Sequence, residues 1–376
     1  MQKKPLSKTG AVSSDIPPEN QVEYDMIVFC HLRWDFVYQR PQHVIHRMSE
    51  HYKILFIEEP IPFGAGEEKT AELITISENL HILKPRVNSI ADIKFVLPMY
   101  VANTTVAYGW FYSPAFVYML NELTFETIIY DCMDELTMFK HASELLKAQE
   151  IYLLSEADVV FTGGKSLYES KKQVHENVHC FPSSVDRKHF AQAMNGISLP
   201  EDLPGDGKPV VGYYGVIDER IDLGLLQEVA EKMPDVNFVL IGPIAKIDEN
   251  DLPSAKNIFY PGMKSYSELP NYLKGFDVAL MPFALNDATK FISPTKTLEY
   301  MAANKPIVST AIYDVVRDYN ESVAVIKNAE ECVKAIREIL NHSAAEKQKR
   351  QQQFEVILNN TSWDKTVKNM REIIKN

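Results

Sequence analysis

Three side chains, Arg220, Lys296 and Glu299, have the chemistry needed to bind a ligand that carries phosphates and hydroxyls. Arginine presents paired donors in a fixed fork that matches phosphate oxygens, and lysine acts as a point charge. Lys296 falls in the first turn of an expected helix, where a cation opposes the helix dipole unless an anion binds there. We therefore interpret Arg220 and Lys296 as a diphosphate site. The competing interpretation is two solvated ion pairs, Glu219 with Arg220 and Lys296 with Glu299, which would contribute little.

The segment that positions Lys296 runs from Phe291 to Thr310. It follows the apolar run 278–281, which predicts a buried strand. Ser293 is a good N-cap residue and Pro294 suits the first helical position, so a helix is expected to begin there. The helix should end near Asn304, with a second buried strand just beyond.

Gly215 and Arg220 follow another predicted strand, Val210 to Tyr214. In an open α/β sheet, ligands bind beyond the carboxyl ends of the strands, so Arg220 is well placed for a diphosphate. The glycine spacing differs from the dinucleotide fingerprint, and the chain has no Walker A loop. It also lacks a Gly-x-Ser-x-Gly elbow and any clustered Cys and His, which argues against a serine hydrolase and a catalytic metal.

A second group of charged residues follows two strands in the first half of the chain: Arg33, Asp35, Arg40, Asp131 and Asp134. We expect this group to face a cleft on the acceptor side. Asp131 and Asp134 are candidates to orient an acceptor hydroxyl or to act as a weak base, and capping of the following helix is an equal alternative.

Other residues near these positions have plainer interpretations. We expect Trp34, Phe36 and Tyr38 to anchor their loop, although aromatic rings can also stack on a sugar. His43 and His46 are expected to pack or to lie on the surface. The turn 163–166 is either a weak phosphate cradle or a tight turn with a cap.

Composition limits the class of protein. The chain has 376 residues, 45% of them hydrophobic, which favours two globular domains. The net charge of -12 argues against a general nucleic-acid binder. Four widely spaced cysteines suit reduced thiols, and neither a signal-peptide core nor a membrane-spanning run is visible, so we expect a cytoplasmic protein.

Strands alternate with helices in both halves, which predicts an α/β fold with two doubly wound domains. We expect a flexible tail over 1–23, a first domain over 24–198, a second over 209–358 and a final helix over 359–376 that packs on the first domain. The Pro- and Gly-rich stretch 199–208 is the expected linker. Apolar residues at helical spacing in 144–156 (Leu145, Ala148, Ile151 and Tyr152) are expected to be core.

These stretches resemble retaining GT-B glycosyltransferases. The donor half is similar over 212–220, 239–242, 277–282 and 293–310, and the segments 34–43 and 181–186 are similar to a subgroup of bacterial enzymes linked to surface polysaccharide, of family 4 type. The resemblance implies a central cleft between two Rossmann-like domains.

The resemblance also implies roles for site residues. Arg220 and Lys296 would hold the donor diphosphate and offset the leaving-group charge in place of a metal, with no cofactor. Glu299 would bind the ribose hydroxyls. Gly215, Ser293 and Thr295 complete the expected donor site. Such enzymes often have an acid eight residues before Glu299, where this chain has Phe291. Either Ser293, Thr295 and backbone groups of the loop, together with Asp287, then hold the sugar, or the donor is unusual, or activity is reduced.

The expected function is transfer of a hexose from a UDP- or GDP-type sugar donor to a glycan or lipid-linked acceptor. Arg220, Lys296 and Asp134 are the expected catalytic residues, and peripheral membrane contact is a further expectation. Two alternatives remain: a catalytically silent sugar-nucleotide-binding or scaffold protein, and a sugar-nucleotide epimerase of GT-B type. No nucleic-acid partner is expected.

Overall fold

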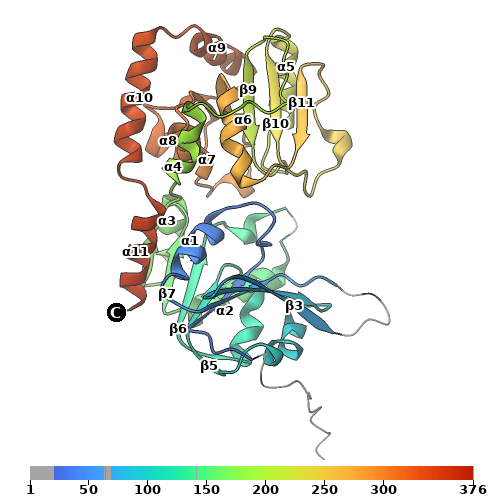
Figure 1. Cartoon of the computed structure of the whole chain (residues 1–376), viewed down its shortest axis with the longest axis vertical. Coiled ribbons are helices and arrows are strands. Elements are labelled where there is room, and N and C mark those ends of the chain that lie inside the picture. The colour runs from blue at the N-terminus through green and yellow to red at the C-terminus, as the bar shows by residue number, and fades with distance from the viewer. Residues whose placement is uncertain (1–20, 63, 65–68, 141, 376) are drawn as a thin grey trace, which may run out of the picture.

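The computed structural model describes residues 21–62, 64, 69–140 and 142–375, which form two domains stacked along the long axis of the molecule (Figure 1). Most of the expected tail 1–23 lies outside the described residues. At its end, Val22 forms a parallel bridge with Val101.

The first domain contains an eight-stranded sheet in the order β3-β4-β2-β1-β5-β6-β7-β8. All neighbouring pairs are parallel except β3 and β4. Chain order reverses beside β1, which lies between β2 and β5. The strands are β1 (Met26–Cys30), β2 (Ile54–Glu58), β3 (Thr70–Ser77), β4 (Leu80–Arg86), β5 (Thr105–Phe111), β6 (Thr124–Cys132), β7 (Val159–Thr162) and β8 (Val178–Cys180).

The second domain contains a six-stranded parallel sheet in the order β11-β10-β9-β12-β13-β14. Here chain order reverses between β9 and β12, so the loops after these two strands flank the usual ligand position of an open sheet. The strands are β9 (Val210–Tyr214), β10 (Asn237–Ile241), β11 (Ile258–Gly262), β12 (Val278–Met281), β13 (Ile307–Thr310) and β14 (Ala324–Ile326).

Helices cover both sheets (Figure 1). The α-helices are α1 (Arg40–Met48), α2 (Glu144–Glu156), α3 (Lys165–Lys171), α4 (Arg187–Phe190), α5 (Leu223–Lys232), α6 (Leu269–Gly275), α7 (Thr295–Ala302), α8 (Tyr313–Tyr319), α9 (Ala329–Leu340), α10 (Ala344–Leu358) and α11 (Trp363–Ile374). The 3₁₀ helices are η2 (Ile90–Phe95), η3 (Leu97–Met99), η4 (Pro114–Asn121), η5 (Leu136–Met138), η6 (Ala191–Met194), η7 (Glu249–Asp251), η8 (Tyr266–Glu268) and η9 (Asp287–Thr289).

The chain passes between the domains earlier than its composition indicates. Val185, Phe190 and Ala193 already pack in the core of the second domain, so the first crossing lies at about 181–184 rather than at 199–208. The chain returns at its end, where Trp363 and Met370 of α11 pack against the first sheet (Figure 1). Each domain therefore has its own core, and two segments connect them.

Two local expectations are wrong. Helix α7 begins at Thr295 with Pro294 as N-cap, and no side chain caps it, so Ser293 is not the N-cap. Helix α2 has the expected bounds but the opposite orientation: Gln149 and Glu150 are buried, whereas Ile151 is 71% exposed. Long-range partners explain the second difference, because Glu150 accepts a hydrogen bond from Tyr130 and pairs with Lys171 inside the domain.

All four cysteines are free thiols, as their spacing indicates. Within the described part of the chain, no helix combines the length and the apolar character needed to cross a membrane.

Candidate functional site

A narrow cavity of about 90 Å³ lies between the domains, at the carboxyl ends of their strands. Both domains contribute to its wall. The lining residues are Val37, Gln39, Arg40, Met133, Asp134, Gly163 and Ser183 from the first domain and Tyr213, Val216, Arg220, Phe283, Ile292, Ser293, Pro294, Thr295 and Lys296 from the second. The structure thus brings together Arg220, Lys296, Asp134, Ser293 and Thr295, which the sequence indicated separately.

Arg220 is held in place by Asp218. Its Nε and Nη2 donate to the Asp218 carboxylate at 3.0 and 2.7 Å, and its backbone N–H donates to the same group. The guanidinium also lies 5.7 Å from the ring centre of Phe139, a residue of the first domain. Because arginine has five N–H donors, the Nη1 hydrogens remain for a phosphate. Arg220 therefore pairs with Asp218 and not with Glu219, the partner in the competing interpretation.

Lys296 lies against the backbone of Gly215. A Cβ atom at Gly215 would come within 2.3 Å of Lys296 Cε, and Gly215 has a φ of +141°, which other residues rarely adopt. Burial lowers the pKa of Lys296, the negative charge of Glu299 opposes this effect, and the charge of Arg220 adds to it. The two cations together therefore favour an anion in the cavity.

Glu299 is buried behind the cavity wall. Its Oε2 accepts a hydrogen bond of 2.7 Å from the Tyr214 hydroxyl, and the residue is 8% exposed. Burial raises the pKa of Glu299, while the positive charge of Lys296 and the Tyr214 hydrogen bond lower it. The expected grouping of Lys296 with Glu299 thus exists as a charge interaction inside the domain, not on its surface.

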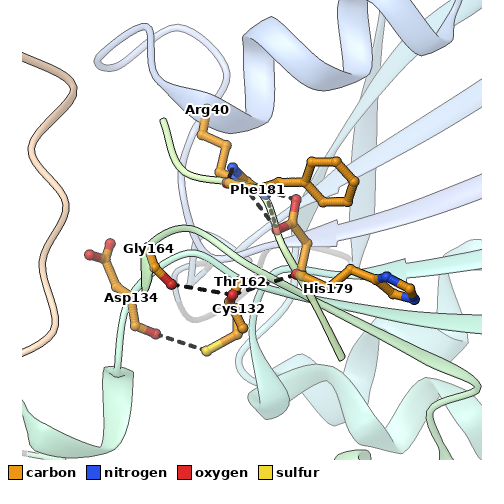
Figure 2. A network of polar contacts seen from close by, with 8 residues as sticks. Arg40, Cys132, Asp134, Thr162, Gly164, His179 and Phe181 are labelled. Carbon is orange, nitrogen blue, oxygen red and sulfur yellow. Dashed lines mark hydrogen bonds and ion pairs between the residues drawn. The ribbon is translucent and has the colours of Figure 1, made fainter. Parts of the chain in front are cut away.

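Asp134 faces both domains from the loop after β6. Burial raises the pKa of its carboxyl, and the charge of Arg220 across the cleft lowers it. Its backbone oxygen accepts a weak hydrogen bond from the Cys132 thiol (Figure 2). Neither Asp131 nor Asp134 caps a helix, because Glu135 occupies the N-cap position of η5 and Ser143 that of α2. Asp134 is therefore free to face a ligand.

The loop of Asp134 is supported from behind by a buried charge cluster. Lys171 Nζ lies 2.7 Å from Glu135 Oε2 and 2.8 Å from Glu150 Oε1. Tyr130 donates to Glu150 as well. Because an unpaired buried charge is costly, these contacts fix the backbone next to Asp134.

Arg40 and Asp131 form a buried ion pair. Arg40 is 3% and Asp131 0% exposed, and Nη2 lies 2.8 Å from Oδ1. Arg40 Nη1 also donates to the Phe181 carbonyl at 2.6 Å (Figure 2). The pair joins α1, β6 and the crossing segment. The predicted role in acceptor binding is contradicted for Asp131, whose oxygens are used inside the domain.

Arg33 and Asp35 lie outside both cleft cavities. Asp35 is 65% exposed and pairs with Lys84, while Arg33 is 42% exposed and lies 3.9 Å from Glu58. Both residues therefore belong to surface ion pairs, and the structure gives them no place in the cleft.

A second cavity of about 480 Å³ adjoins the first one. The two share Gln39, Asp134, Val216 and Arg220. The second cavity extends from these residues toward the β1–α1 loop and the start of α2. An arrangement of two cavities that meet at Asp134 and Arg220 suits a reaction between two substrates.

Sequence reasoning missed several residues of the second cavity, of which His31 is the most informative. It directly follows β1, and its buried Nδ1 has no hydrogen-bond partner among the described residues. Burial and then the charge of Lys246 lower its pKa to about 4, so the ring is neutral at pH 7. Its position directly after a strand was a signal that could have identified it.

Phe36 also lines this cavity and does not anchor the loop, unlike Trp34, which packs against Phe56.

Phe291 lies away from the first cavity and packs against the core of the first domain. Asp287 lines the same outer groove as Phe291, so it is not placed to hold a sugar in the cleft. In the turn 163–166, Gly163 lines the first cavity, and a Cβ at Gly164 would meet Asp314 and Ser293 at 2.8 and 2.9 Å. The turn 163–166 of the first domain therefore packs closely against the second domain.

Over residues 21–62, 64, 69–140 and 142–375, no group of three or more His, Cys, Asp or Glu side chains is arranged to hold a metal ion.

Residues 208–342 match the family model described as Glycosyl transferases group 1. Sucrose-phosphate synthase from Thermosynechococcus elongatus superposes with a TM-score of 0.69 and 14% identity, covering 93% of this chain and 98% of that one. The fold is GT-B. Residues 208–342, which match the family model, include Arg220, Lys296 and Glu299.

Other GT-B structures agree. Trehalose-6-phosphate synthase OtsA gives a TM-score of 0.68 at 12% identity over 94% of this chain and 99% of that one. An α,α-trehalose-phosphate synthase (UDP-forming) from Burkholderia vietnamiensis gives 0.67 at 10% identity over 94% and 97%.

A curated relative of Bacillus subtilis (strain 168), named as teichuronic acid biosynthesis glycosyltransferase TuaH, is 25% identical over 217 residues, 54% of each chain. The chain thus matches about half the length of this relative. The family model and this relative are both described as glycosyltransferases.

Proposed function

We propose that this chain transfers a sugar from a nucleoside diphosphate donor to a hydroxyl of a glycan or lipid-linked acceptor, with retention and without a metal. The observation that carries the proposal is the meeting of Arg220 and Lys296 from one domain with Asp134 from the other on a single cavity. Two cations that are already in position before the reaction stabilise the negative charge that develops on the leaving diphosphate. The GT-B relatives support the same reaction class.

The single carboxylate of the first cavity favours a retaining mechanism in which the acceptor attacks and the diphosphate leaves on the same face of the sugar. Of the described residues that line the first cavity, Asp134 is the one carboxylate. A double displacement needs a nucleophile and a separate acid on the two sides of the sugar. Instead, the acceptor oxygen bonds to the sugar C1 while the bond from C1 to the diphosphate oxygen breaks, and the acceptor proton passes to that diphosphate. Asp134 orients the acceptor hydroxyl.

Donor entry requires domain motion. The first cavity measures about 90 Å³, and ordinary ligand pockets measure about 300–1,000 Å³. The domains therefore separate to admit the donor and close again to exclude water.

The test is nucleotide binding and sugar transfer by Arg220→Ala. A charge-assisted hydrogen bond contributes about 1.5–3 kcal/mol, so affinity for UDP or GDP should fall at least about tenfold. Arg337→Ala is the matched control, because Arg337 forms a similar pair with Asp235 on the surface of the same domain. Full transfer by Arg220→Ala would contradict the proposal.

A binding protein without turnover is the second candidate, and the position of Phe291 favours it. Where similar enzymes often have an acid, this side chain packs on the first domain. Calorimetry with sugar nucleotides beside a donor-hydrolysis assay separates the two. Donor binding with neither hydrolysis nor transfer would identify a silent site, and an altered donor sugar without acceptor would identify an epimerase.

A further inference from the structure

Phe139 of the first domain lies against two cations of the second domain. Its ring centre is 5.7 Å from the central guanidinium carbon of Arg220 and 5.5 Å from Lys246 Nζ. A cation within about 6 Å of an aromatic ring centre is attracted to the face of that ring. The two cations come from different loops, the one after β9 and the one after β10. The ring therefore connects the first domain to both loops at the wall of the second cavity, which all three residues line.

The segment that carries Phe139 is anchored inside the first domain. Phe139 directly follows η5, whose N-cap position is occupied by Glu135. The buried Glu135 carboxylate lies 2.7 Å from Lys171 Nζ and accepts a hydrogen bond of 2.9 Å from the Thr137 hydroxyl. Because an unpaired buried charge is costly, this pair resists movement of the segment. Asp134 and Phe139 therefore lie on one anchored segment that faces the second domain.

A backbone contact beside the ring joins the same two segments. The Lys140 N–H donates to Glu219 Oε1 at 3.3 Å. Two successive residues of the first domain, Phe139 and Lys140, thus meet two successive residues of the second domain, Glu219 and Arg220. The two sides of this contact belong to different domains, so separation of the domains would break it.

Arg220 is therefore held from two directions. Asp218, in the same domain, accepts from Nε and Nη2, and this contact does not depend on the first domain. Phe139 adds an apolar surface beside the guanidinium, which is 24% exposed. An apolar ring excludes water from that side, and the interactions of a charge strengthen where water is excluded. The ring is in place only when the domains are together.

We propose that Phe139 is a positioning residue that completes the diphosphate site at Arg220 when the domains close. Asp218 alone holds the guanidinium in the open form, and Asp218 and Phe139 hold it together in the closed form. The inference rests on the proposed function, which assigns Arg220 to the donor diphosphate. It goes further by naming a first-domain side chain through which the affinity for the donor depends on closure. Phe139 acts through Arg220 and takes no part in bond making.

The test measures the affinity for UDP or GDP by calorimetry in a double-mutant cycle. Phe139→Leu removes the ring and keeps an apolar side chain. We expect affinity to fall about fivefold, or about 1 kcal/mol, the strength of a partly exposed cation–π contact. In the Arg220→Ala background the same substitution should change affinity by less than about twofold, because the partner of the ring is absent. Phe139→Met repeats the test with a second apolar side chain.

Three further variants separate positioning from a structural effect. Lys246→Met is the matched background, because Lys246 contacts the same ring but does not line the first cavity. There Phe139→Leu should still reduce affinity about fivefold. Phe139→Tyr keeps the aromatic face and should bind the nucleotide as the native protein does. Phe95→Leu removes an exposed ring that has Lys69 Nζ 3.9 Å from its centre, and it should leave affinity unchanged. Circular dichroism shows that each variant is folded.

Three results would overturn the inference. The first is unchanged affinity in both Phe139→Leu and Phe139→Met. The second is an equal loss from Phe139→Leu with and without Arg220, which would mean that the ring acts on the nucleotide by another route. The third is an equal loss in Phe139→Tyr, which would mean that the aromatic face is not what matters.

Failure of the proposed function is read separately, because the binding cycle does not depend on turnover. A native protein that shows the expected cycle but transfers no sugar would contradict the transferase proposal and leave the role of Phe139 intact. Sugar transfer by the native protein together with any of the three results above would contradict the role of Phe139 alone.

Discussion

The Tyr214 hydroxyl donates a hydrogen bond of 2.7 Å to Glu299 Oε2, and both residues are buried in the second domain. Burial raises the pKa of Glu299, and the charge of Lys296 and this hydrogen bond oppose that effect. Tyr214 therefore favours the ionised form of Glu299, and we propose that this form accepts hydrogen bonds from the donor ribose.

Tyr214→Phe should raise the pKa of Glu299 further. On acidification, the variant should then lose nucleotide affinity at a higher pH than the native protein. The midpoint of this loss should move upward by about one pH unit, which corresponds to about 1.4 kcal/mol. Calorimetric titration of UDP or GDP between pH 4.5 and 8 measures this. Superimposable pH profiles of variant and native protein would remove the assigned role of Tyr214.

Gly215→Ala should displace Lys296. The added Cβ would come within 2.3 Å of Lys296 Cε, and the φ of +141° is unfavourable for alanine. We expect nucleotide affinity to fall about tenfold, or about 1.4 kcal/mol, because the ammonium moves from its place beside the cavity. Gly224→Ala is the control, because Gly224 lies within helix α5 and a Cβ there would come no closer than 3.6 Å to its nearest neighbour. Equal affinities in the two variants would contradict the placement of Lys296.

Arg40→Met should destabilise the first domain by about 3–5 kcal/mol, because it leaves Asp131 charged and buried without a partner. The double variant Arg40→Met/Asp131→Leu should recover most of this loss. Urea denaturation followed by circular dichroism measures both. If Arg40→Met changed only acceptor affinity and left the free energy of unfolding intact, the pair would have a ligand-binding role instead.

Acid should destabilise the protein through His43. Its ring stacks on Trp363 with centroids 4.8 Å apart, and burial, then the charges of Arg47 and His189, lower its pKa to about 2. The folded state thus binds fewer protons than the unfolded state between the folded pKa and about 6.5. The contribution of neutral His43 to the free energy of unfolding is therefore complete above about pH 6.5 and decreases by about 1.4 kcal/mol per pH unit below it.

His43→Phe keeps the aromatic contact and removes this titration. The slope of unfolding free energy against pH between 6 and 5 should therefore decrease by about 1.4 kcal/mol per unit. His46→Phe, at an exposed position of the same helix, should leave the slope unchanged. An identical slope in His43→Phe would show that this ring is not the acid-sensitive group.

The contact between α3 and α8 holds the domains together at the cleft. Lys165 pairs with Asp318, Arg317 pairs with Glu169, and Ser166 donates to Asp314. In Asp314→Ala/Asp318→Ala, the domains should separate, so the radius of gyration measured by X-ray scattering should increase without nucleotide and decrease again with it. Asp235→Ala, which breaks a pair within one domain, is the control. No change in the double variant would mean that other contacts set the closed form.

The sequence by itself determined the alternation of strands and helices and the bounds of several elements. Helix 144–156 and strand 210–214 have the expected ends, because hydrophobic period and local capping residues act over a few positions. It also placed Arg220 and Lys296 at the ends of parallel strands, where the edge of a sheet binds ligands. These features depend on neighbours in the chain.

Only the tertiary structure decided which charged groups are partners and which helix face is covered. Arg40 meets Asp131, 91 residues away, so the Asp131 oxygens are used inside the first domain. Glu150 is buried because Lys171 and Tyr130 approach it, and this turns Ile151 to the solvent. Periodicity gives the spacing of side chains around a helix, whereas their environment depends on distant segments that reach the same place.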